Sequence, residues 1–194
     1  SAENTGDWGT AVGYQALAAV VGVDDSGNTG IGHKAGLAIT SGVRNLAVGA
    51  KALAGVTVGD DNVALGYLAY SASTTNANAD RNIAIGSYSL DACTNNEQDN
   101  IAIGYNALTT LDTSNASKNI AIGTQALEDL NSAATDNIAL GYRALQNAGT
   151  DSGIAGNIAI GSLALDDIGN NAVGGCVAIG YDALTDVNNS GAAN

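Results

Sequence analysis

The side chains that could carry chemistry are few in this chain. His33 is the only histidine, so a Ser-His-Asp triad or a histidine-rich metal site would depend on it alone. Paired carboxylates, which can bind calcium or hydrolyse glycosidic bonds, are the other candidates. The pairs are Asp24 with Asp25, Asp60 with Asp61, Glu128 with Asp129, and Asp166 with Asp167.

None of these groups forms a recognisable site in the sequence. The acid pairs fall in spacers and turns, where solvated charge is expected, and the calcium-binding pattern Gly-Gly-x-Gly-x-Asp is absent. A sugar-cleaving cleft favours aromatic platforms, for which only Trp8 and seven tyrosines are present. We therefore expect no catalytic residue, no metal site and no cofactor, and we predict that the protein is not an enzyme.

Charge and composition exclude several kinds of partner. The 194 residues include 19 acids and 6 bases, for a net charge of −13 at pH 7. Nucleic acids and anionic membranes both attract basic surfaces, and no apolar run approaches the roughly 18 residues that cross a bilayer. We therefore expect no nucleic-acid partner and no membrane insertion. The absence of Phe, Met and Pro, beside 26 Gly, favours a thin repetitive cross-section over a compact globule.

One short motif, Asn-x-Ala-(Val/Ile/Leu)-Gly-x-x-Ala-Leu, recurs ten times. Its central glycines are 17 to 20 residues apart, and all variation in length falls in the spacers between motifs. They are Gly13, Gly32, Gly49, Gly66, Gly86, Gly104, Gly123, Gly141, Gly161 and Gly180. Stacked coils predict this pattern, because the motifs must register on one another while the loops need only close. Such a glycine needs a positive φ or a close backbone approach.

Asparagine stands four residues before the glycine in eight of the ten copies. These are Asn28, Asn45, Asn62, Asn82, Asn100, Asn119, Asn137 and Asn157. Gly9 and Cys176 replace asparagine in the first and last copies. In stacked coils we expect an amide ladder, in which each side chain bonds to the next and to nearby backbone groups. The asparagine and glycine columns are the structural site that the sequence predicts.

The motif also predicts the secondary structure of each copy. Residues 100–104 alternate large and small, as a short β-strand does. After the glycine the apolar spacing becomes three, as at Tyr105, Leu108 and Leu111, which predicts one helical or 3₁₀ turn, with an outer strand as the alternative. We therefore expect a mainly β fold, a parallel β-solenoid or β-roll of ten coils of 17–20 residues. It forms one domain over residues 1–194, with core repeats at 9–187.

Stacking also predicts the packing. Strands about 4.8 Å apart give a rod of roughly 45–50 Å and place Cys93 roughly 24 Å from Cys176, too far for a disulfide. We expect the Val/Ile/Leu column before the glycine to face the later leucine column as a dry core. The alanine column would then mark a tight face for another chain. Because no copy at either end is a polar cap, we expect a segment of a longer fibre or end-to-end stacking.

The motif carries a resemblance to known fibres. Asn-x-Ala-(Val/Ile)-Gly followed by a polar stretch resembles the head repeats of trimeric autotransporter adhesins of the YadA type. The longer form at residues 100–108 is similar to repeats of phage tail fibres and of surface proteins that end in an endosialidase-type chaperone domain. The resemblance covers residues 9–187 and implies a homotrimeric β-roll used for reach and adhesion. It implies left-handed coils, whereas the general crossover rule favours right-handed ones.

These observations predict a structural or adhesive fibre segment, from a virion tail fibre or a bacterial surface adhesin, in an extracellular location. Its expected partners are copies of itself, as a homotrimer or an end-to-end filament, and a cell-surface receptor or glycan. One alternative is a polysaccharide depolymerase tailspike, which would want clustered acids and aromatic residues in adjacent coils. Another is an ice-binding solenoid, which would require a column of threonines on one face. The column three residues before the glycine has threonine only at Thr10 and Thr29.

Overall fold

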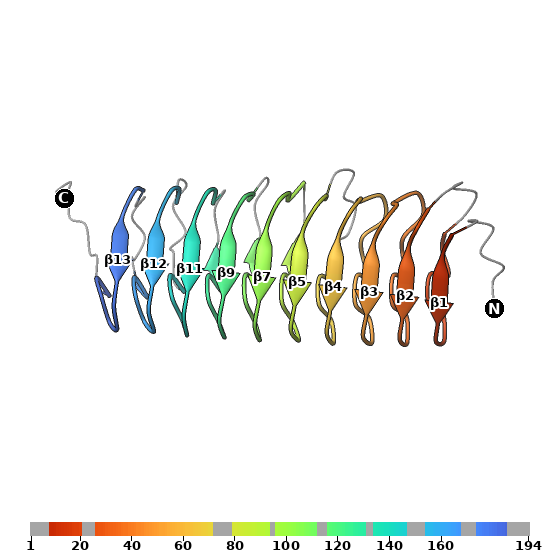
Figure 1. Cartoon of the computed structure of the whole chain (residues 1–194), viewed down its shortest axis with the longest axis horizontal. Helices are drawn as coiled ribbons and strands as arrows, with labels where there is room; N and C mark the ends of the chain where they lie inside the picture. Colours follow the sequence, from red (N-terminus) through yellow and green to blue (C-terminus); the bar gives the residue numbers. More distant parts are fainter. Residues whose placement is uncertain are drawn as a thin grey trace.

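The computed structural model describes residues 8–20, 26–71, 79–93, 96–111, 116–130, 134–146, 154–167 and 174–185. Within them, ten three-residue strands stack in parallel as one sheet along a rod (Figure 1). The strands are β1 (Thr10–Val12), β2 (Thr29–Ile31), β3 (Leu46–Val48), β4 (Val63–Leu65), β5 (Ile83–Ile85), β7 (Ile101–Ile103), β9 (Ile120–Ile122), β11 (Ile138–Leu140), β12 (Ile158–Ile160) and β13 (Val177–Ile179). The predicted parallel β-solenoid, with one strand of this sheet per coil, is confirmed.

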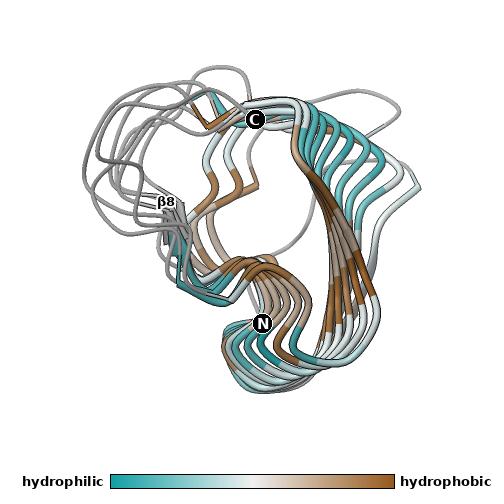
Figure 2. Ribbon diagram, turned by 90° about the vertical axis from the view of Figure 1, so that its left-hand side faces the viewer, coloured by the Kyte–Doolittle hydropathy of each residue, from teal (hydrophilic) through white to brown (hydrophobic). Residues whose placement is uncertain are grey.

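The coils stack in a fixed register, so every motif position forms a column along the rod. Ile101, Ala102 and Ile103 pair with Ile120, Ala121 and Ile122 of the next coil. The described coils superimpose closely when they are viewed along the rod (Figure 2). Below, coils are numbered one to ten by their motif glycine, and positions are counted from that glycine, so that position −2 is the alanine of the strand. The described residues include no helix that could cross a membrane.

Each strand ends at the motif glycine, and no other residue type fits at this position. All ten glycines have φ between +126° and +143°. In the first nine, an added Cβ would lie 2.3–2.6 Å from the carbonyl oxygen of the next motif glycine. The coils therefore touch backbone to backbone at this column, and both the conformation and the contact exclude a side chain.

The segment after the glycine is not a helical or 3₁₀ turn, and that prediction was wrong. Residues at positions +2 and +4 have left-handed φ of 50–61° in every coil, and no helix can contain this alternation. Their N–H groups donate to neighbouring coils, as Lys34 does to the Tyr14 carbonyl and Leu17 to the Ala35 carbonyl, at 2.8 and 2.9 Å. The spacing of three reflects successive turns whose backbone bonds run between coils.

The alternative of an outer strand holds in three coils. The strands β6 (Ala92–Cys93), β8 (Thr110–Leu111) and β10 (Asp129–Leu130) pair in parallel as a second, three-stranded sheet. Isolated bridges join Ser117, Thr135, Ala155 and Gly174 in a further column at position −6. Backbone pairing between neighbouring coils therefore continues on several walls of the rod.

The interior is lined by small residues on one wall and leucines on the other. Alanines at position −2 are buried after the first coil, and the leucines at position +4 that cover them are buried before the last coil. They are Ala47, Ala64, Ala84, Ala102, Ala121, Ala139, Ala159 and Ala178, with Leu17, Leu53, Leu90, Leu108, Leu127, Leu145 and Leu165. The expected placement of the Val/Ile/Leu column in the core was therefore wrong. The thin coil is filled by leucine from one wall, which leaves room only for alanine on the other.

Candidate functional site: the asparagine column and the aliphatic face

The asparagine column lies inside the coil, at the entrance to each strand, and its side chains bond from coil to coil. The Asn28 Oδ1 atom accepts the Asn45 backbone N–H at 2.9 Å and its Nδ2 at 3.2 Å. Asn45 Nδ2 also donates to the Gly59 carbonyl at 2.7 Å. The same arrangement follows in the next coil, where Asn45 Oδ1 accepts hydrogen bonds from the backbone N–H and the Nδ2 atom of Asn62, at 2.9 and 3.1 Å. Two donated and two accepted bonds saturate the amide.

The same pattern recurs along the column, and all eight side chains are buried. At coil ten, the Cys176 N–H donates to Asn157 Oδ1 at 2.9 Å, so the backbone half of the pattern persists where the amide is missing. Asn82 Nδ2 of coil five also donates to the hydroxyl of Tyr70, which replaces the inward leucine of coil four, at 3.1 Å. The column is thus a buried structural element whose inner members use their hydrogen-bonding capacity within the rod.

The outward face of the ten-stranded sheet is aliphatic. It consists of the side chains at positions −3 and −1, which we call the aliphatic face. Beyond Thr10 and Thr29, position −3 holds only Leu, Val or Ile, and position −1 does so in every coil. Most side chains of this face are half-buried in the middle coils. The exposed fraction rises to 42% at Leu140, 57% at Val12 and 67% at Ile179. Sequence reasoning placed these residues inside, because alternation shows two faces without saying which is inward.

An uncovered aliphatic face is unusual for a parallel sheet. Parallel sheets are normally covered on both faces, and contiguous apolar patches of this kind mark sites of association. Here one face packs on the leucines of the rod, and no described segment of the chain packs over the other. The aliphatic face is therefore the candidate interaction surface.

A column of aromatic residues borders the aliphatic face at position +1. Tyr14 stacks on His33 with ring centroids 5.6 Å apart and planes 10° from parallel. Tyr88, at position +2, makes edge contacts with Tyr67 and Tyr105 at 5.5 and 6.0 Å. His33 is thus the aromatic member of its coil. The described residues contain no group of three or more His, Cys, Asp or Glu side chains that could hold a metal ion.

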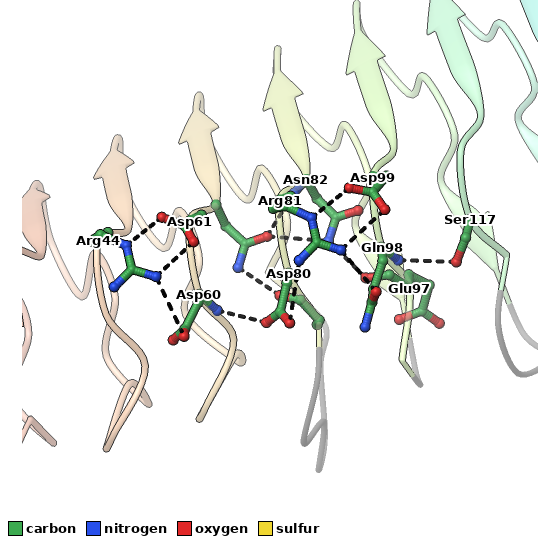
Figure 3. A network of polar contacts seen from close by, with 12 residues as sticks. Arg44, Asp60, Asp61, Asp80, Arg81, Asn82, Glu97, Gln98, Asp99 and Ser117 are labelled. Atoms are coloured by element: carbon green, nitrogen blue, oxygen red, sulfur yellow. Dashed lines mark hydrogen bonds and ion pairs between the residues drawn. The ribbon is translucent and has the colours of Figure 1, made fainter.

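The Asp60–Asp61 pair has basic partners in the structure. The Arg44 guanidinium donates to both carboxylate oxygens of Asp61, at 2.6 and 2.8 Å, and lies 3.8 Å from Asp60 (Figure 3). The hydrogen bond from Arg44 lowers the pKa of Asp61, because it stabilises the ionised carboxylate. These carboxylates therefore serve the contact between coils three and four.

The carboxylates of the other acid pairs also contact residues of neighbouring coils where the structure describes them. Glu128 accepts hydrogen bonds from Asn106, Gln125 and Gln146, three amides of successive coils. Asp166 lies 3.7 Å from Arg143, and burial raises the pKa of its carboxyl. Asp24 and Asp25 lie outside the described residues, as do the Cys93 side chain and the end of the tenth repeat at residue 187. Cys176 is a half-buried free thiol.

Comparison of the chain with protein-family models, with curated proteins and with solved structures gave no match. The likeness to fibre repeats therefore rests on the residues of the motif, and the described geometry establishes the β-solenoid architecture.

Proposed function

We propose that this chain is a structural segment of an extracellular fibre, in which three copies pack around a common axis through their aliphatic faces. The observation that carries the proposal is the uncovered aliphatic face, which extends over every strand of the sheet. In water such a surface favours association, because each buried methylene contributes about 0.8 kcal/mol. The resemblance of the motif to the repeats of trimeric fibres supports the same arrangement.

The shape of the surface favours three chains over an open sheet of many. The aliphatic face is only two side chains wide and follows the long axis of the rod, with the tyrosine column at one border. A narrow stripe closes around a symmetry axis that is parallel to it, and threefold closure leaves the ends of the rod free. This assigns the contact to the isoleucine and valine columns, and not to the alanine column, which is buried inside each coil.

The rod itself suits a mechanical role. Backbone bonds join the described coils, amides join coils two to nine, and Asp61, Asp99 and Glu128 bind basic or amide partners of neighbouring coils. A stiff spacer that presents its loops or its neighbouring domains to a receptor needs this axial continuity and no reactive group.

Native mass measured by light scattering tests the proposal. We expect about 57 kDa at micromolar concentration, three times the 19.1 kDa chain. The triple variant Ile85→Ser, Ile103→Ser and Ile122→Ser should reduce the mass to one chain while the far-ultraviolet circular dichroism stays unchanged. The control Leu68→Ser with Leu163→Ser removes half-buried leucines from turns away from the face and should remain trimeric. A monodisperse monomer in the unchanged protein would overturn the proposal.

A further inference from the structure

Charged residues of alternating sign occupy one column in the middle of the rod. At position −5, six successive coils carry a base, an acid, a base, an acid, a base and an acid. They are Arg44, Asp61, Arg81, Asp99, Lys118 and Asp136, which we call the charge column. Four of them are seen side by side along the rod in Figure 3. The alternation is visible in the sequence only after the coils are aligned on their glycines.

The backbone conformation at this position favours glycine, so each charged residue there adds conformational strain. All six have left-handed φ of 57–61°, a region in which non-glycine residues are uncommon. Three other coils place Gly27, Gly156 and Gly175 there, with φ of 56°, 70° and 74°. Because the same fold accepts glycine without strain, the six charged residues point to a role for their side chains.

The charges interact between successive coils. Arg81 donates to both oxygens of Asp99 at 2.7 and 3.2 Å, as Arg44 does to Asp61. Asp61 and Asp99 also interact electrostatically with the base of the following coil. The hydrogen bond from Arg81 is the main cause of the lowered pKa of Asp99, and the charge of Lys118 lowers it further. Two of its five steps are ion pairs with hydrogen bonds, and no two successive members of the column have like charge.

The strand, asparagine and glycine contacts between coils are the same at most coil junctions and do little to distinguish one coil from another. Strands β5, β7, β9 and β12 share the sequence Ile-Ala-Ile, and the asparagines and glycines beside them repeat as well. A coil that stacks on its second neighbour, with one coil looped out, would reproduce the strand pairing and the amide ladder. Closing the looped-out segment adds only a modest entropic cost.

We propose that the charge column fixes the order in which the coils stack. Looping out any one of its four inner coils brings two like charges together: without Arg81, Asp61 meets Asp99, and without Asp61, Arg44 meets Arg81. The correct order places opposite charges beside each other throughout the column, and the omission of one inner coil places two like charges together. The column thus acts against a misfolded state that the repeated strands alone would tolerate. This inference does not depend on how many chains associate.

A pair of cysteines can report the looped-out state directly. Ser71 and Thr109 both occupy position +5, in coils four and six, and Ser71 bonds to Asp91 of the coil between them. In correct order the two positions lie about 9.6 Å apart, twice the strand spacing and beyond disulfide reach. Ser71→Cys with Thr109→Cys, in a background of Cys93→Ser and Cys176→Ser, forms an intrachain disulfide when coil five is omitted. Ser71→Cys with Asp91→Cys is the positive control for adjacent coils.

The decisive comparison uses two variants that share one substitution. Asp61→Arg makes two correct contacts repulsive and makes the contact formed on omitting coil five attractive. The inverted column also contains Asp61→Arg but keeps the alternation: its other changes are Arg44→Asp, Arg81→Asp, Asp99→Arg, Lys118→Asp and Asp136→Lys. Each full-length variant is unfolded in urea, refolded at low concentration under mild oxidation, and assayed for the intrachain disulfide by non-reducing electrophoresis and peptide mass.

We expect Asp61→Arg to raise the reporter disulfide about fivefold or more over the unchanged column, and the inverted column to return it to the unchanged level. High salt should reduce the difference, because the charges are exposed. The proposal would be overturned if Asp61→Arg gave the same yield of the reporter disulfide as the unchanged column, or the same yield as the inverted column. If Asp61→Arg fails to refold, recovery of folded protein in the inverted column supports it, and equal loss in both overturns it.

Discussion

Gly104 packs directly on the backbone of Gly123 in the next coil, so that a Cβ on Gly104 would lie 2.4 Å from the Gly123 carbonyl oxygen. The same contact recurs from Gly13 to Gly161, whereas Gly180 has the same positive φ and nothing within 4 Å of an added Cβ. The two situations separate the effect of conformation from the effect of contact.

We predict that Gly104→Ala lowers the free energy of unfolding by about 3–5 kcal/mol, through backbone strain and overlap together. Gly180→Ala should cost about 1–3 kcal/mol, since only the strain applies. Urea unfolding followed by circular dichroism measures both. Equal losses would show that conformation alone excludes side chains from this column.

Ala102 and Ile103 are neighbours in β7 and face opposite sides of the sheet. Ala102→Leu should lower the free energy of unfolding by about 1–3 kcal/mol, because the interior has no room for a larger side chain. Ile103→Ser, on the aliphatic face, should reduce native mass and leave the circular dichroism spectrum unchanged. A reversed outcome, with loss of fold on changing Ile103 and loss of assembly on changing Ala102, would place the chain contact on the alanine column.

Asn100→Asp should make stability depend on pH in a way that the unchanged protein does not. The Asn100 Nδ2 atom faces two acceptors, Asn82 Oδ1 at 3.2 Å and the Ala116 carbonyl at 2.9 Å. A carboxylate there is buried against two oxygens, which raises its pKa above the unfolded value of about 3.9. Relative stability is therefore highest below that value and falls as the pH rises through the folded pKa.

We expect this variant to lose about 3 kcal/mol or more at pH 7 relative to the unchanged protein, and clearly less at pH 3. Urea midpoints at the two pH values provide the test. Asn100→Ala is the control, since it lacks a titrating group and its loss should be the same at both. A loss from Asn100→Asp that is equally independent of pH would contradict the saturated amide ladder.

Asp166 should oppose folding as it ionises. Burial raises the pKa of its carboxyl above the unfolded value, so its penalty is absent at low pH and appears as the pH rises through the folded pKa. We predict that Asp166→Asn becomes more stable relative to the unchanged protein between pH 3 and pH 7. Melting temperatures across that range measure the difference. A difference that stays constant or reverses would show that Arg143 compensates for the burial.

The register of the strands could be predicted from the sequence, because each copy repeats the same elements at nearly the same spacing. The glycine that ends each strand could be predicted as well, since it recurs in all ten copies. The turns could not. A spacing of three, as from Tyr105 to Leu108, is shared by a helix and by successive left-handed turns, and only the bonds between coils distinguish them.

Which face of each strand points inward could not be predicted either, because that depends on how thin the coil is. In a globular sheet the larger residue of an alternating pair points inward, which would bury Ile103 and expose Ala102. A coil this thin is filled by Leu108 from the opposite wall, and the larger residue must point outward. The charge column was missed because its signal runs between coils and is absent from any single copy.

The amides of the asparagine column all point the same way along the rod. From Asn45 to Asn157, each Nδ2 atom donates to the Oδ1 atom of the preceding asparagine, so the nitrogen lies toward the first coil and the oxygen toward the last. Bond dipoles aligned in this way reinforce and polarise one another. The rod therefore has an electrical direction, and two rods joined end to end keep their dipoles in series only when both run the same way.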